Sequence, residues 1–120
     1  MVSRRHHLLA LLAVTWVACG DYQISLPNHY ILGRIQSDSF VIAAPDHKIV
    51  LGPSIKRYAI VRDFVVGVEA REYSAESYFV LNTSTGVVEH MQSSNEWRRR
   101  LQELAMSEPL LAKPQRSQAR

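Results

Sequence analysis

Hydrophobic positions along most of the chain recur at the spacing of short β-strands. Runs rich in β-branched and aromatic residues are separated by Gly, Pro, Asn and Asp, which is typical of strands joined by turns. These runs cover residues 30–35, 39–44, 48–51, 55–62, 64–69, 77–81 and 87–91. We therefore predict a mainly β (α+β) fold, an antiparallel meander of about six or seven short strands.

The last two runs predict the clearest hairpin of the chain. They are joined by Asn82-Thr-Ser-Thr-Gly86, in which Gly86 offers the positive φ of a loop with a bulge and Asn82 can bond the turn. Alternation puts apolar side chains on both faces of the first strand, with Tyr78 and Val80 on one and Phe79 and Leu81 on the other. We expect this strand to be central and covered on both sides.

A single helix is predicted after the last strand. Ser93-x-x-Glu96 has the spacing of a capping box, in which each side chain bonds a backbone N–H of the first turn. Apolar residues then follow on one stripe: Trp97, Leu101, Leu104 and Ala105. Because a helix of about 14 residues is marginal alone in water, we expect this stripe to pack on the sheet.

The N-terminal residues follow a different pattern. Arg4 and Arg5 precede an apolar run, Leu8 to Ala18, in which Thr15 is the only polar side chain. These eleven residues rise about 16 Å as a helix, roughly half of a bilayer core, so they do not predict a membrane span. A basic start, a short apolar run and small residues after it predict a secretory signal peptide over residues 1–18.

The end of this run, Val17-Ala18-Cys19-Gly20, resembles the end of a bacterial lipoprotein signal. The resemblance implies cleavage before Cys19, a diacylglycerol on its thiol and acylation of the new amino group. Val17 and Ala18 match the two preceding positions, whereas Trp16 stands where Leu is usual. Ordinary cleavage after Gly20 is the alternative, because Ala18-x-Gly20 also fits the small-residue rule.

The composition and charge of the chain exclude several classes of protein. Cys19 is the only cysteine, which excludes a disulfide framework, a CxxC pair and a thiolate zinc site. After cleavage, twelve basic side chains stand against eleven acidic ones, and residues 19–112 carry nine against eleven. No basic domain remains that would favour nucleic acid.

The mature chain divides into three parts. Residues 19–28 predict a lipid-anchored tether and an edge strand ended by Pro27, and residues 29–106 predict the small β domain with its helix. Residues 107–120, with two prolines and mostly polar side chains, predict a disordered tail.

The order of these pieces loosely resembles a domain-of-unknown-function family of small bacterial lipoproteins. The similarity lies in the Cys-Gly-Asp-Tyr start at residue 19, the run of short strands, Tyr78-Phe-Val-Leu-Asn-Thr-Ser-Thr-Gly-Val-Val88 and the Trp-containing helix. It covers most of residues 19–105. It implies a shape and a location, and no active site or ligand.

Histidines are the first candidates for chemistry. His29 and His47 fall in turns after prolines, and Asp46 is expected to bond its own turn. His90 alternates with Val88, which favours a surface or edge position. No two histidines have metal-ligand spacing and no G-x-S-x-G motif fixes a serine nucleophile.

Carboxylates are the second candidates. Glu69, Glu72 and Glu76 suggest paired acids, but we expect them in a polar loop where their charge keeps the chain soluble. The sequence therefore predicts no catalytic residue, no cofactor and no metal site.

The densest basic run is Arg98-Arg99-Arg100 in the helix. Pairs four residues apart, Glu96 with Arg100 and Arg99 with Glu103, are expected to support the helix. The run is interpreted as a solvated helix face, and its functional alternative is a contact with anionic headgroups or an acidic partner.

Together these features predict a small lipid-anchored protein of the bacterial cell envelope. We expect a non-enzymatic protein-interaction module, held to the membrane through Cys19 and bound to another envelope protein. Gly20, rather than Asp, after Cys19 implies by resemblance the outer membrane, facing the periplasm. The alternatives are a periplasmic immunity lipoprotein that inhibits a toxin, an envelope assembly or structural factor and, with less support, a small hydrolase.

Overall fold

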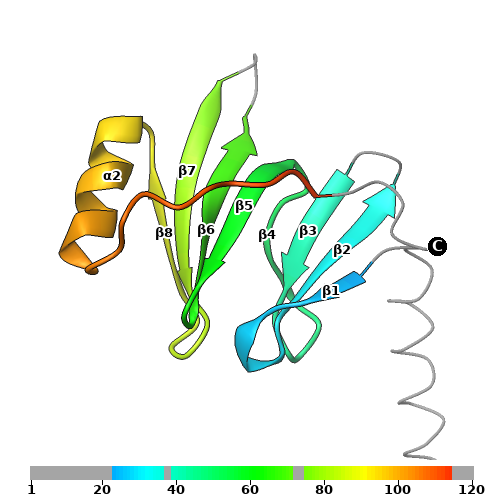
Figure 1. Cartoon of the computed structure of the whole chain (residues 1–120). Helices are drawn as coiled ribbons and strands as arrows, with labels where there is room; N and C mark the ends of the chain where they lie inside the picture. Colours follow the sequence, from blue (N-terminus) through cyan, green and yellow to red (C-terminus); the bar gives the residue numbers. More distant parts are fainter. Residues whose placement is uncertain (1–22, 37–38, 72–74, 115–120) are drawn as a thin grey trace, which may run out of the picture.

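Two four-stranded antiparallel sheets make up most of the fold in a computed structural model, which describes residues 23–36, 39–71 and 75–114. In each sheet, strands that follow one another in the chain are neighbours (Figure 1). The first sheet contains β1 (Gln23–Ser25), β2 (Ile31–Gln36), β3 (Ser39–Ala43) and β4 (Ile49–Leu51), with the 3-10 turn η1 (Pro27–His29) after β1. The second contains β5 (Ile55–Val61), β6 (Phe64–Ala70), β7 (Glu76–Asn82) and β8 (Val87–Met91), and α2 (Ser94–Glu103) follows it.

The predicted mainly β fold is confirmed, and the meander is divided into two at Gly52-Pro53-Ser54. The backbone of this segment bonds both sheets: Phe40 N–H of β3 donates to the Pro53 carbonyl, and Ala70 N–H of β6 donates to the Ser54 carbonyl, each at 2.9 Å. Gly52 has φ +109°, and a Cβ there would lie 2.6 Å from the Phe40 carbonyl oxygen. The chain therefore changes sheets at a position that only glycine fits.

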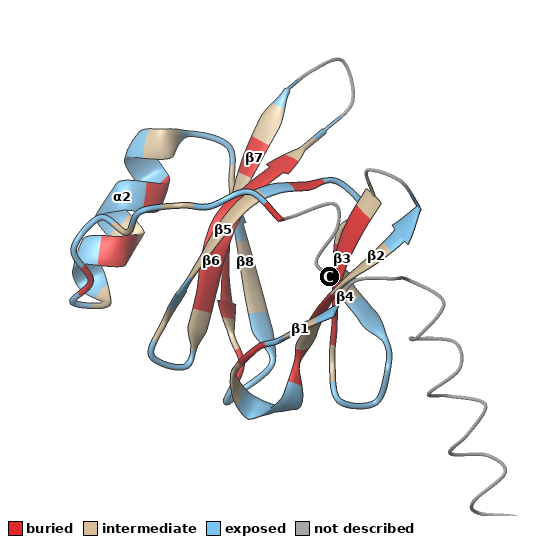
Figure 2. Cartoon of the chain, turned by 45° about the vertical axis from the view of Figure 1, so that its right-hand side comes forward, coloured by how far each residue is buried: buried red, intermediate tan, exposed pale blue. Residues whose placement is uncertain are grey.

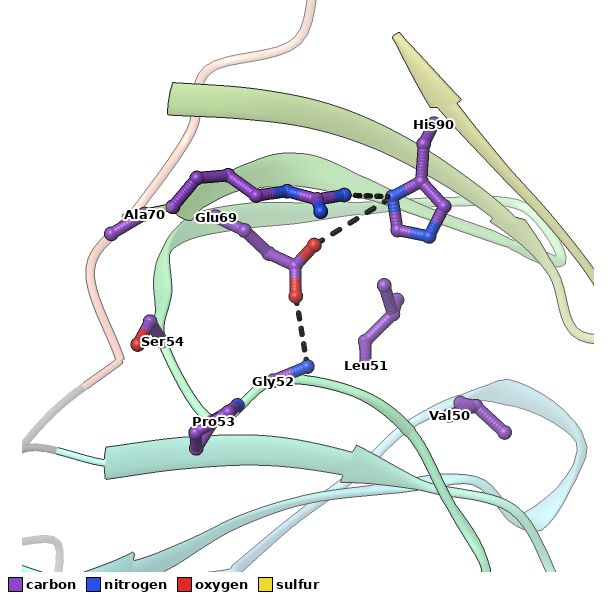
Figure 3. Close-up of a pocket in the computed structure, with 9 residues that line it drawn as sticks. Val50, Leu51, Gly52, Pro53, Ser54, Glu69, Ala70 and His90 are labelled. Carbon is purple, nitrogen blue, oxygen red and sulfur yellow. Dashed lines mark hydrogen bonds and ion pairs between the residues drawn. The ribbon is translucent and has the colours of Figure 1, made fainter. Parts of the chain in front are cut away.

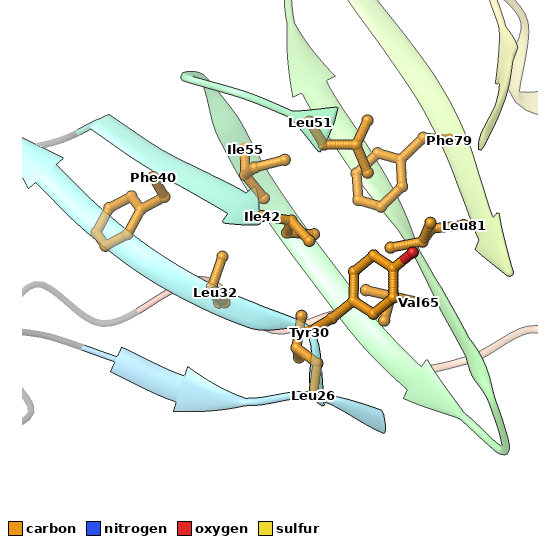
Figure 4. Close-up of a cluster of buried hydrophobic side chains, with 10 residues drawn as sticks. All are labelled: Leu26, Tyr30, Leu32, Phe40, Ile42, Leu51, Ile55, Val65, Phe79 and Leu81. Atoms are coloured by element: carbon orange, nitrogen blue, oxygen red, sulfur yellow. The ribbon is translucent and has the colours of Figure 1, made fainter. Parts of the chain in front are cut away.

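The main core lies between the two sheets (Figure 4). It is formed by inward-facing side chains of both: Leu26, Tyr30, Leu32, Phe40, Ile42, Leu51, Ile55, Val65, Phe79 and Leu81. The loop that joins β7 to β8 has the predicted bonds, because Asn82 Oδ1 accepts the N–H groups of Ser84 and Thr85 and Gly86 has φ +82°.

A second core lies on the opposite face of the second sheet, under α2. Val66 and Val80 meet Trp97 and Leu101 of the helix, and Figure 2 shows buried residues along β6 and on α2. Trp97 Nε1 donates to the Phe79 carbonyl at 3.1 Å. Strand β7 is therefore central and covered on both sides, as predicted.

The start of α2 also agrees with the sequence. Ser93 is the N-cap, and its Oγ accepts the Glu96 N–H at 3.0 Å. This bond satisfies one of the free amide groups of the first turn.

The first part of the predicted disordered tail, residues 107–114, makes contacts with the second sheet, and residues 115–120 lie outside the described residues. Ala112 exchanges two backbone hydrogen bonds with Tyr58 of β5, both 2.9 Å long, and Leu111 packs on the second core. The polar composition of residues 107–120 did not predict this bridge, which pairs part of the edge of β5. The predicted signal peptide, Cys19 and residues 20–22 lie outside the described residues.

Candidate functional site

The inward face of the second sheet changes from apolar to polar along β6, β7 and β8. In β6 the inward positions run from Val65 through Gly67 to Glu69, and Arg71 follows them with the same period of two. Neighbouring strands change in the same direction, because Glu69 pairs with Ser77 of β7 and Phe79 of β7 pairs with His90 of β8. The polar side chains therefore collect at one end of the face that carries the main core.

Glu69 is the buried charged member of this group, with 8% of its surface exposed, and Ser77 beside it is buried too. Its Oε2 accepts the Gly52 N–H at 2.9 Å, and its Oε1 lies 3.7 Å from His90 Nδ1 (Figure 3). A buried carboxylate is costly without such partners. Glu69 therefore fixes the segment that joins the two sheets to the second sheet.

Arg71, just after β6, contacts side chains of both β7 and β8. Its Nη2 lies 3.3 Å from His90 Nδ1 and 3.4 Å from Ser77 Oγ. A guanidinium only donates, so the contact is a hydrogen bond when His90 Nδ1 carries no proton, whereas a protonated Nδ1 pairs with Glu69. Ser77 Oγ donates to the Met91 carbonyl at 3.5 Å, so Ser77, His90 and Glu69 do not form a serine–histidine–carboxylate relay.

Two adjoining cavities surround the Arg71–His90 contact. One has a volume of ≈ 290 Å³ and the other ≈ 420 Å³, and Arg71 and His90 line both. The smaller is also lined by Val50, Leu51, Gly52, Pro53, Ser54, Glu69 and Ala70, and the larger by Ala75, Glu76, Ser77 and Gln92. Sites for small ligands commonly occupy about 300–1,000 Å³, so the space suits one side chain or a short chain end.

The three carboxylates expected in one polar loop have different places. Glu69 is in β6 and buried, which corrects the prediction for it. Glu76 begins β7 and pairs with Lys56 at 3.1 Å and with Arg57 at 3.9 Å. Glu72 lies outside the described residues. The sequence did contain a signal for this burial: Glu69 lies four residues after the core residue Val65, and alternate residues of a strand lie on the same face.

Two of the histidines lie in turns, as predicted. His29 and His47 are exposed and have φ values of 67° and 71°. Asp46 Oδ1 accepts the Lys48 N–H at 3.1 Å, so this acid bonds its own turn. Within the described segments, no group of three or more His, Cys, Asp or Glu residues is placed to hold a metal ion.

The three arginines of α2 have different environments. Arg100 forms a two-point contact with Glu89 at 2.8 and 3.0 Å and a bond with Glu103 at 3.1 Å, and Arg98 pairs with Glu108 at 3.3 Å. Hydrogen bonds to Glu89, and next to Glu103, raise the pKa of Arg100 above its ordinary value. Arg99 makes no hydrogen bond or ion pair with the described residues. Of the three arginines, only Arg99 therefore has no acidic partner among the described residues.

Comparison with models of known protein families, with curated proteins and with solved structures finds no match to the chain. In the part of the chain that the structure describes, no helix has the length and apolar character needed to cross a bilayer.

Proposed function

We propose that the chain is a small lipid-anchored cell-envelope protein whose folded part is a non-enzymatic protein-interaction module. The observation that carries the proposal is Cys19, the only thiol, directly after a basic start and a short apolar run. More than one acyl chain at this position makes a stable anchor, because each buried methylene contributes about 0.8 kcal/mol.

The distance between the anchor and the fold limits where the module acts. Strand β1 begins at Gln23, four residues after Cys19, and four extended residues span at most about 14 Å. A lipid on Cys19 holds the first sheet close to the membrane surface. A partner within reach is a component of the same membrane or a protein that touches it.

The polar end of the second sheet supports binding rather than catalysis. Ser77 Oγ is engaged by Arg71 and by a backbone carbonyl, and it has no bond to His90 that would activate it. The same side chains line cavities and present hydrogen-bond donors, which suits the recognition of a polar group.

The anchor is tested by Cys19→Ser in the native host. We expect this variant to lose labelling by radioactive palmitate and to leave the membrane fraction. Gly20→Ala, which keeps a small residue after Cys19, serves as the matched control and should stay labelled and membrane-bound. A Cys19→Ser protein that remains in the membrane would show that the lipid is not the anchor.

The proposed location is tested in a host with two membranes. With Gly20 after Cys19 we expect the protein in the outer membrane, facing the periplasm, and Gly20→Asp should move it to the inner membrane. Finding the unaltered protein only in the inner membrane contradicts the location and leaves the lipid anchor in place.

A further inference from the structure

We infer that the two cavities around Arg71 and His90 bind a carboxylate group of the partner protein, presented by an extended segment that lies against β8. The inference deepens the proposed function, on which it rests, by naming the chemical group that the partner presents. The carboxylate belongs to an acidic side chain or to a chain end, which share the same chemistry.

Arg71 has no acidic partner among the described residues, in contrast to four other cations of the fold. Lys56 and Arg57 share Glu76, Arg98 pairs with Glu108, and Arg100 pairs with Glu89 and Glu103. The two contacts of Arg71, with Ser77 and with His90, use a single nitrogen, Nη2. Its Nε and Nη1 have no hydrogen-bond partner among the described residues, so donors remain for an incoming anion.

Arg71 is also held in place before any ligand arrives. The hydroxyl of Ser77 and the ring of His90 fix its guanidinium between two cavities. Arg99 likewise has no acidic partner, but it lines neither cavity and no described side chain fixes it. A side chain that is already ordered loses less entropy on binding, which favours Arg71 as the binding group.

The charges around the cavities favour an anion with a single charge. Glu69 is the opposing charge, and its Oε2 is already engaged by the Gly52 N–H. Glu76 is shared between Lys56 and Arg57. With Arg71, these groups are three cations and two carboxylates, so their net charge is one positive charge. A carboxylate balances that charge, whereas a doubly charged phosphate would leave repulsion with the nearby Glu69.

The edge strand β8 supplies the backbone contact for the partner segment. It is the last strand of its sheet, so one side of its backbone has no strand partner among the described residues. An extended peptide can add to such an edge through main-chain hydrogen bonds. His90 lies within β8 and Gln92 just after it. Figure 3 shows His90 facing Glu69, and Arg71 Nη2 lies 3.3 Å from His90 Nδ1. A segment on this edge thus reaches the cavities with one of its side chains or its end.

The experiment is isothermal titration calorimetry, in which short peptides are titrated into the purified full chain in non-ionic detergent. Three short Thr/Val peptides are compared: one capped at both ends with a central Asp, its capped Asn counterpart, and the Asn peptide with a free terminal carboxyl. We expect one or both acidic peptides to bind at least about tenfold more tightly than the capped Asn peptide. Preference for the Asp peptide assigns a side chain, and preference for the free acid assigns a chain end.

Two variants show whether Arg71 carries this preference. Arg71→Gln should remove it, and Arg71→Lys, which keeps the charge without the planar fork, should retain part of it. The matched control is Arg99→Gln, which should bind like the unaltered chain. Equal binding of acidic and neutral peptides, no binding, or the same loss in Arg99→Gln would overturn the inference.

The outcome is separable from that of the proposed function. Cys19→Ser should bind the peptides unchanged, because the anchor takes no part in the cavities. Peptides that do not bind to a chain that carries lipid would remove this inference alone. Binding to a chain whose Cys19 carries no lipid would leave the site and remove the lipid anchor.

Discussion

The two faces of the second sheet differ in what the side chains of β6, β7 and β8 do. On the face under α2, Val66 of β6 and Val80 of β7 meet Trp97 and Leu101. On the inward face, Val65 and Phe79 belong to the main core, but the positions beyond them are polar and line the cavities. One face is devoted to stability, whereas the other combines stability with a hydrogen-bonded polar group. Substitutions on the two faces should therefore have different consequences.

The largest effect is expected on the face under the helix. Trp97, with 3% of its surface exposed, packs against Val66, Val80 and Tyr78 and donates to the Phe79 carbonyl. Trp97→Ala should cost about 3–5 kcal/mol of the free energy of unfolding, measured by urea denaturation. Trp97→Phe keeps most of the packing without the N–H donor and should lose clearly less. An unchanged midpoint for Trp97→Ala would mean that the helix does not stabilise the sheet.

A smaller loss is expected at the polar end of the inward face. Glu69→Ala removes the acceptor of the Gly52 N–H and should cost about 1–3 kcal/mol. Glu69→Gln keeps an acceptor oxygen and serves as the matched control, with a smaller loss. The check is the same denaturation, together with exchange of the Gly52 amide hydrogen. Equal stability of the two variants would show that the bond to Gly52 is not the stabilising contact.

The helix cap should contribute less than either core. Ser93→Ala removes the oxygen that accepts the Glu96 N–H and should lower the free energy of unfolding by about 1 kcal/mol. Ser94→Ala, one residue further along, is the control and should change it by no more than about 0.5 kcal/mol. The difference is measured by thermal unfolding, and equal midpoints would contradict the role of Ser93.

The smallest effects separate the arginines of α2. Arg100→Ala removes a two-point contact to Glu89 that is partly shielded from water, and it should cost up to about 1 kcal/mol. Arg99→Ala should change stability by no more than about 0.5 kcal/mol. If Arg99→Ala weakens attachment to vesicles that contain anionic lipid while the fold stays intact, the arginine run contacts the membrane rather than only the solvent.

Much of the fold could be predicted from local pattern. Alternation along residues 77–81, with Asn82 and Gly86 in the loop, predicted a central strand and its turn, and both are observed. The Ser93 cap and the position of Trp97 were also predicted correctly. These features depend on residues close together in the chain, where spacing alone fixes which face a side chain occupies.

The candidate site was largely missed because its members lie on three strands. Glu69, Arg71, Ser77 and His90 meet only through the register of β6, β7 and β8. The polar residues near the turn were interpreted as a loop, because composition does not show that Glu69 occupies the same inward face of the strand as Val65. Listing the alternate residues that share one face of each predicted strand would have shown that this face changes from apolar to polar side chains.

By itself, the sequence determined the β character, the hairpin, the cap and the amphipathic helix, since each follows from backbone preferences and periodicity over a few residues. The tertiary structure decided the division into two sheets, the burial of Glu69 and the partners of the charges. Arg100 illustrates the difference: the helical spacing predicted a pair with Glu96, whereas packing of α2 beside β8 brings Glu89 within 2.8 Å. A long side chain bonds the carboxylate that packing presents in the better geometry, and contacts between elements distant in the chain cannot be read from spacing.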